Sequence, residues 1–185
     1  MNFESYLAYF ESIVRDEANA PSPYDNPEYF QYTKLNWSRM NRWLKTAQIN
    51  ADLQVLIASI DQAQHWIVIT EPWCGDAAHS VPFIELFSRY NEKITVSYEL
   101  RDNDPHRIEA YLSNGSKSIP IIVCRDENDR DLAVWGPRPA ACQALFEKLK
   151  AENVDMENIK TAIQHWYNED KGQAVQADFL KLLQK

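Results

Sequence analysis

Cysteine and glycine are scarce in this sequence, which has three cysteines and four glycines among 185 residues. Three cysteines cannot all pair within one chain, so we expect free thiols in a reducing, cytoplasmic compartment instead of a disulfide framework. No apolar run approaches the roughly 18 residues of a membrane span. The first residues also lack the basic and apolar regions of a secretory signal. The sequence thus predicts a cytoplasmic protein with no membrane partner.

Basic residues are also in the minority, with 19 Lys and Arg against 27 Asp and Glu and a formal net charge of −8. This balance argues against a nucleic-acid partner, because the phosphates would be repelled overall. Residues 34–45 do interleave four basic residues with two tryptophans, but a solvated helix face with its tryptophans in the core is the favoured interpretation. An apolar share of 45 % provides for a core without disulfides or a structural metal.

Hydrophobic periodicity divides the chain into a helical start, a mixed centre and a helical tail. Apolar residues recur at helical spacing three times before residue 62, whereas the centre begins with a compact β-branched run. The strands at 66–70 and 94–100 flank a helix and should be parallel, whereas those at 118–125 and 131–135 should form a hairpin. The predicted helices cover about 3–14, 28–46, 51–60, 77–90, 104–112 and 140–150, with two more in the tail broken around 170–172. We therefore predict an N-terminal helical extension over 1–62, an α/β domain over 63–150, and a C-terminal helical tail over 151–185 packed on that domain.

One cysteine, Cys74, lies where the sequence favours a reactive thiolate. Trp73-Cys74-Gly75 stands between the first predicted strand and the following helix. The free backbone N–H groups and the dipole at a helix N-terminus favour the thiolate, which is the nucleophilic form. Asp76 opposes this effect, because a nearby carboxylate disfavours a thiolate. His79 follows on a partly different helix face, so a surface histidine is the favoured interpretation.

Four features in order resemble the thioredoxin family. Trp73-Cys74-Gly75-Asp76-Ala77 is similar to its Trp-Cys-Gly-x-Cys turn. The other three are a proline eight residues after the cysteine, the Ile119–Pro120 pair at the start of a strand, and a glycine at the end of the last strand; in this sequence they are Pro82, Pro120 and Gly136. The resemblance covers about residues 60–150. It implies a thioredoxin-like fold, with a four-stranded mixed sheet flanked by helices.

Departures from the family pattern bear on the mechanism. Ala77 stands where the family has its second, resolving cysteine, so an adduct on Cys74 would need an outside thiol to release it. Cys124 lies about 13 Å along its strand from Pro120, which is beyond the roughly 7 Å that a disulfide allows between Cα atoms. Cys142 lies outside the motif and has no assigned role.

The resemblance predicts single-cysteine thiol chemistry as the function and leaves one alternative open. In the predicted function, Cys74 forms mixed disulfides with a protein or a low-molecular-weight thiol, and Trp73, Gly75, Asp76, Ile119 and Pro120 surround the substrate. There the Ile119 backbone would pair with an extended peptide. In the alternative, the fold is a redox-inactive binding module that docks a peptide or protein partner. The sequence indicates no cofactor and no metal site, and it does not predict the oligomeric state.

Overall fold

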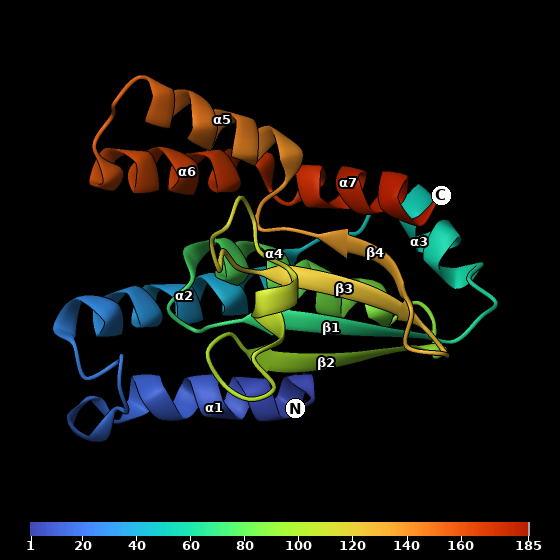
Figure 1. The fold of residues 1–185 in the computed structure, drawn as a ribbon, viewed down its shortest axis with the longest axis horizontal. Coiled ribbons are helices and arrows are strands. Elements are labelled where there is room, and N and C mark those ends of the chain that lie inside the picture. The colour runs from blue at the N-terminus through green and yellow to red at the C-terminus, as the bar shows by residue number, and fades with distance from the viewer. Residues whose placement is uncertain (185) are drawn as a thin grey trace.

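The computed structural model describes residues 1–184, which form helices around one four-stranded sheet (Figure 1). The two short 3-10 segments are named η1 and η2. The elements in chain order are α1 (Phe3–Arg15), η1 (Glu17–Asn19), α2 (Pro27–Thr46), α3 (Ala51–Ala58), β1 (Gln64–Thr70), α4 (Gly75–Ser88), β2 (Ile94–Leu100), η2 (Arg107–Ala110), β3 (Ile121–Asp126), β4 (Asp131–Trp135), α5 (Ala140–Ala151), α6 (Met156–Asp170) and α7 (Gln173–Leu183).

The sheet has the strand order β2-β1-β3-β4. β1 pairs with β2 in parallel, whereas the β1–β3 and β3–β4 pairs are antiparallel. The helix α4 makes the crossover between β1 and β2, and a tight turn joins β3 to β4. The predicted four-stranded mixed sheet flanked by helices is therefore confirmed.

Helices from both ends of the chain complete the core. In Figure 1, α2 and α4 lie behind the sheet, α1 lies along the β2 edge, and α5, α6 and α7 lie above β4. Phe179 of α7 packs against three aromatic rings, those of Trp66, Phe87 and Trp135. Tyr6 of α1 stacks on Tyr98 of β2 with 5.3 Å between ring centroids. The extension and the tail thus share one hydrophobic core with the sheet.

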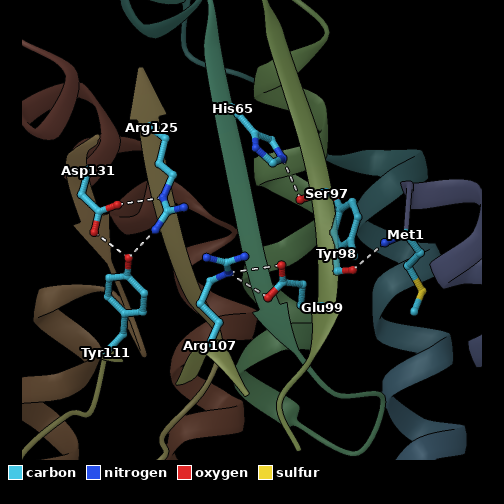
Figure 2. Close-up of polar contacts among 9 residues, drawn as sticks. All are labelled: Met1, His65, Ser97, Tyr98, Glu99, Arg107, Tyr111, Arg125 and Asp131. Atoms are coloured by element: carbon cyan, nitrogen blue, oxygen red, sulfur yellow. Dashed lines mark hydrogen bonds and ion pairs between the residues drawn. The ribbon is translucent and has the colours of Figure 1, made fainter. Parts of the chain in front are cut away.

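The face of the sheet nearest the viewer in Figure 1 carries paired polar side chains (Figure 2). His65 Nε2 lies 2.8 Å from the Ser97 hydroxyl oxygen. The Arg107 guanidinium, from η2, donates to Glu99 at 2.9 Å. On β3 and β4, Arg125 donates to Asp131. These pairs satisfy the polar groups of a face that the short η2 segment crosses.

The first three α-helices begin in the same way. Each follows an asparagine (Asn2, Asn26 and Asn50) whose side-chain oxygen accepts from a backbone amide of the first turn. Pro27 occupies the first position of α2, where its missing N–H costs nothing. These side-chain caps explain why the helices start where they do.

The predicted helix over 104–112 is wrong. His106 takes a left-handed conformation with φ of 53°, so the chain turns there instead of continuing as a helix from residue 104. The helical segment is the short 3-10 turn η2, which starts at Arg107. Lys185, which the prediction included in the tail, lies outside the described residues. Within residues 1–184, no helix has both the length and the apolar character needed to cross a membrane.

Candidate functional site

The Trp73-Cys74-Gly75 turn joins the end of β1 to the start of α4. Cys74 is the N-cap of α4, and its sulfur accepts a hydrogen bond from the Ala77 backbone amide at 3.4 Å. The Asn36 side chain on α2 donates to the Pro72 carbonyl at 3.0 Å. The turn is therefore held from two sides, by its own helix and by α2.

The Cys74 thiol is buried and already hydrogen-bonded. The residue is 7 % exposed, and its thiol donates to the Ile119 carbonyl with 3.3 Å between sulfur and oxygen. Burial, and after it the Asp76 carboxylate, raise the pKa of the Cys74 thiol to about 12. The Ala77 amide and the Arg138 guanidinium lower this pKa, but by less. The thiol, not the thiolate, is the form that this site favours at neutral pH.

Ile119, Pro120 and Gly136 pack together near the cysteine turn. Ile119 and Pro120 are buried, and the peptide bond between them is cis. Gly136 has φ of 127°, and a Cβ there would overlap the Pro120 carbonyl oxygen. Glycine is therefore required at this position, because both the backbone conformation and the close approach exclude a side chain.

Asp76 is the centre of a partly buried polar network. Its carboxylate pairs with Arg138 at 2.7 Å and accepts from the Tyr167 hydroxyl of α6 at 2.9 Å. Burial raises the pKa of Asp76, and both partners offset that effect. The Arg138 guanidinium also lies 4.3 Å from the centre of the Phe146 ring on α5. One carboxylate thus connects the cysteine turn to the C-terminal helices.

The prediction of a surface histidine at His79 is wrong. The residue is 3 % exposed, and Trp43 on α2 donates its indole N–H to His79 Nδ1 at 2.9 Å. His79 Nε2 lies 3.0 Å from the Gln164 amide oxygen, and the ring stacks on Tyr167 with 4.4 Å between centroids. Burial lowers the pKa of His79 to about 3. The ring is therefore neutral, and it ties α2, α4 and α6 together instead of serving Cys74.

A cleft of about 360 Å³ opens beside the turn, between α2 and α6. Of the predicted site residues, Trp73, Cys74, Gly75 and Asp76 lie among the lining residues, whereas Ile119 and Pro120 do not. Most of the other lining side chains are aromatic, aliphatic or basic. They come from α2, α4, α5, α6 and the segment before α5: Glu28, Tyr29, Tyr32, Arg39, His79, Arg138, Phe146, Met156, Ile159, Lys160, Ile163, Gln164 and Tyr167.

All three cysteines are free and buried. Cys124 lies on β3 opposite Trp66 of β1, and Cys142 lies in α5. Burial raises the pKa of each of these two thiols to about 12. Among residues 1–184, no three His, Cys, Asp or Glu side chains come together as the ligands of a metal ion would.

Sequence reasoning missed the residues that α5 and α6 bring to the turn. Arg138 is one residue of a Gly-Pro-Arg-Pro segment, and Tyr167 is one tyrosine of a helical pattern. Neither carries a signal that would pair it with Asp76, which lies 91 residues before Tyr167. Arg39 belongs to the basic helix face over residues 34–45, a pattern that does not indicate that it borders the cleft.

Comparison with known proteins agrees with this architecture. A family model described as thioredoxin matches residues 24–150, a span that starts before α2 and ends within α5. Two solved structures, a protein of unknown function from Pseudomonas aeruginosa and an HIV epitope-scaffold, share the fold at 15 % identity with TM-scores of 0.58 and 0.56. Both alignments cover 100 % of this chain and 98 % of the other. No curated protein matches the sequence. On the family match, the chain belongs to the thioredoxin family.

Proposed function

We propose that this protein is a thioredoxin-fold binding module that docks a peptide segment of a protein partner, without thiol–disulfide exchange. One observation carries the proposal: the Cys74 thiol is buried and hydrogen-bonded beside an open cleft. A thiol with its pKa raised to about 12 supplies little thiolate near neutral pH. In this proposal Cys74 is a structural part of the turn, and the cleft is the working surface.

The lining of the cleft suits a docked segment. Tyr29 is 43 % exposed and Met156 is 50 % exposed, so apolar and aromatic groups are accessible at its mouth. Exposed apolar side chains gathered at a cleft are typical of interaction sites. A volume of about 360 Å³ accommodates anchor side chains of a partner.

Arg39 provides the polar element of the cleft. Its guanidinium donates to the Asn36 side-chain oxygen at 2.8 Å, and within residues 1–184 it forms no ion pair with a carboxylate. Arg39 is partly buried, and this burial lowers the pKa of its guanidinium. A carbonyl or carboxylate oxygen of the partner would therefore be a favourable acceptor for its remaining N–H groups.

Single-cysteine exchange is the competing function. In that reaction, the Cys74 thiolate would attack a disulfide sulfur, form a mixed disulfide and release the other sulfur as a thiolate. The position of Cys74 beside the cleft and the Ala77 amide on its sulfur favour this chemistry. Burial and the Asp76 carboxylate oppose the ionisation that it needs, which is why we place it second.

Selection from a displayed library of random dodecapeptides tests the docking. We expect enriched peptides to bind wild type and Cys74→Ala equally, and to lose binding to Met156→Asp. Met156 begins α6, where an aspartate is compatible with the helix. Val55→Asp is the control, because Val55 is 70 % exposed on α3, away from the cleft. Peptides that need the Cys74 sulfur, peptides that bind all variants alike, or no enrichment would overturn docking in this cleft.

Incubation with oxidised glutathione tests the redox half of the proposal. We expect intact-mass spectra at neutral pH to show no glutathione adduct on the folded protein, and an adduct once urea exposes the cysteines. A stoichiometric adduct on Cys74 of the folded protein would instead favour single-cysteine exchange.

A further inference from the structure

A second cavity, of about 250 Å³, lies near the end of β1 and shares only Tyr29 and Trp73 with the cleft. Its walls come from α1, the segment after η1, the start of α2, the end of β1 and the loop after β2. The lining residues are Tyr9, Ser22, Pro23, Tyr24, Tyr29, Glu71, Trp73, Leu100, Arg101, Asp102 and Asn103. Four of these residues are aromatic. Apart from Tyr29 and Trp73, none of the lining residues belongs to the proposed docking cleft.

Glu71 is the unusual member of this lining. The residue is 6 % exposed, and its carboxylate accepts a hydrogen bond from the Tyr24 hydroxyl at 3.0 Å. Within residues 1–184 it forms no ion pair. The nearby Arg101 guanidinium is paired with Asp102 and lies 4.7 Å from the centre of the Trp73 ring. Burial raises the pKa of Glu71, as expected for a carboxylate removed from water without a paired cation.

The charges of the lining are unbalanced. Glu71 and Asp102 are acidic, whereas Arg101 is the one basic residue among those that line the cavity. A buried carboxylate costs free energy unless it is paired with a cation. Here the residues that line the cavity carry a net negative charge. A cation that entered the cavity would therefore gain a counter-ion that is already positioned by Tyr24.

We propose that this cavity binds an organic cation with N–H donors on an alkyl stem, such as the ammonium group of a lysine side chain or of a free alkylamine, with Glu71 as its counter-ion. The acceptor that it would meet is the Glu71 carboxylate. A carboxylate offers about four acceptor sites, of which Tyr24 uses one and the Asp102 backbone amide takes another. The aromatic rings of Tyr9, Tyr24 and Tyr29 provide surface for the stem and attraction for the charge.

Titration followed by two-dimensional NMR tests this proposal on the full-length protein. The probe is Nα-acetyl-lysine amide, and Nα-acetyl-norleucine amide is its uncharged counterpart with a similar stem. We expect saturable shifts of the Trp73 indole and of the Arg101 and Asp102 amides with the lysine compound and not with the norleucine compound. Equal shifts with both, or no saturable shift up to about 50 mM, would overturn the proposal.

Two further ligands separate the sources and the chemistry. Binding of n-butylammonium as tight as that of the lysine compound would identify free amines as ligands. Clearly weaker binding of n-butylammonium would identify a lysine within a peptide, and either result supports the site. Choline has a cationic head without N–H donors. Binding of choline as tight as that of the lysine compound would overturn the requirement for N–H donors.

Glu71→Gln provides the test on the protein side. This change keeps the size of the side chain and an acceptor for Tyr24 but removes the charge. We expect affinity for the lysine compound to fall about tenfold or more. Glu127→Gln, at an exposed residue of the β3–β4 turn, should bind as wild type does. Unchanged affinity in Glu71→Gln would contradict the role of Glu71. Since the peptide selection depends on Met156 and this titration on Glu71, either proposal can fail alone.

Discussion

At the scale of single residues, the state of Cys74 is decided by competition between helix position and burial. Capping α4 favours a thiolate, as the sequence predicts, and the Ala77 amide does reach the sulfur. Burial acts in the opposite direction and is the larger effect, followed by the Asp76 carboxylate. The motif identifies the position of the cysteine. Its ionisation depends on burial and on Asp76, which the motif does not encode.

The first prediction concerns Asp76→Asn. Without the carboxylate, Cys74 loses a group that raises its pKa, and the unpaired Arg138 lowers it further. We expect the pKa of Cys74 to fall by about one unit, with faster alkylation of Cys74 at pH 8. Mass spectrometry of the Cys74 peptide after timed iodoacetamide treatment measures this rate. An unchanged or slower rate in a folded variant would show that Asp76 has no electrostatic influence on the sulfur.

At the scale of elements, regular strands and helices could be predicted from periodicity, and their polar connections could not. The alternating run over Ile94–Leu100 is the strand β2 with the predicted bounds. The predicted helix over 104–112 is wrong because a left-handed His106 interrupts it, and no sequence pattern indicates such a residue. The predicted surface position of His79 is wrong for another reason. A polar residue on an amphipathic helix normally faces water, but here Trp43 and Gln164 bury it between α2 and α6.

The second prediction is that His79 remains neutral in acid. Its pKa in the folded protein, about 3, is below that of the unfolded chain, so its contribution to stability is complete above pH 6.5. That contribution is lost as pH falls from about 6.5 toward 3. Ring ¹⁵N shifts should report a neutral imidazole, protonated on Nε2, down to about pH 4. Titration near 6.5 in the folded protein would mean that the ring is not held as described.

The third prediction compares two glycines with left-handed backbones. Gly172, between α6 and α7, has φ of 78°, and a Cβ there would overlap the Phe83 ring. Gly115 has φ of 76° with nothing within 4 Å of such a Cβ. We expect Gly115→Ala to cost about 1 kcal/mol of unfolding free energy. The added overlap should bring Gly172→Ala to about 3 kcal/mol. Equal losses in urea denaturation would contradict close packing of Gly172 on α4.

At the scale of the whole molecule, helices on either side of the cysteine turn build the site. The thioredoxin-like sheet positions the turn, whereas α2 and α6 form the walls of the cleft beside it. Composition and motif could predict the family, the sheet and the free thiols. They could not predict the cleft, because it depends on how α2 and α6 pack side by side, and contacting residues such as Tyr32 and Glu157 are 125 residues apart in sequence.

The fourth prediction is a single cooperative unfolding transition. α1, α2, α3 and α7 share the main core, and the α5–α6 pair is joined to it through Asp76, Arg138 and Tyr167. Circular dichroism and tryptophan fluorescence should therefore give coincident urea curves. Two separated transitions would show that the helical tail unfolds independently of the thioredoxin-like body.

The central claim is that Cys74 is a structural thiol beside a docking cleft. The most direct test is the pH dependence of iodoacetamide alkylation at Cys74 in the native protein, with the Cys74 peptide quantified from pH 5 to pH 10. We predict a rate that still rises at pH 10 without a plateau, as burial and Asp76 require. A half-maximal rate below the free-cysteine pKa of about 8.5 would contradict the claim and make Cys74 a nucleophile.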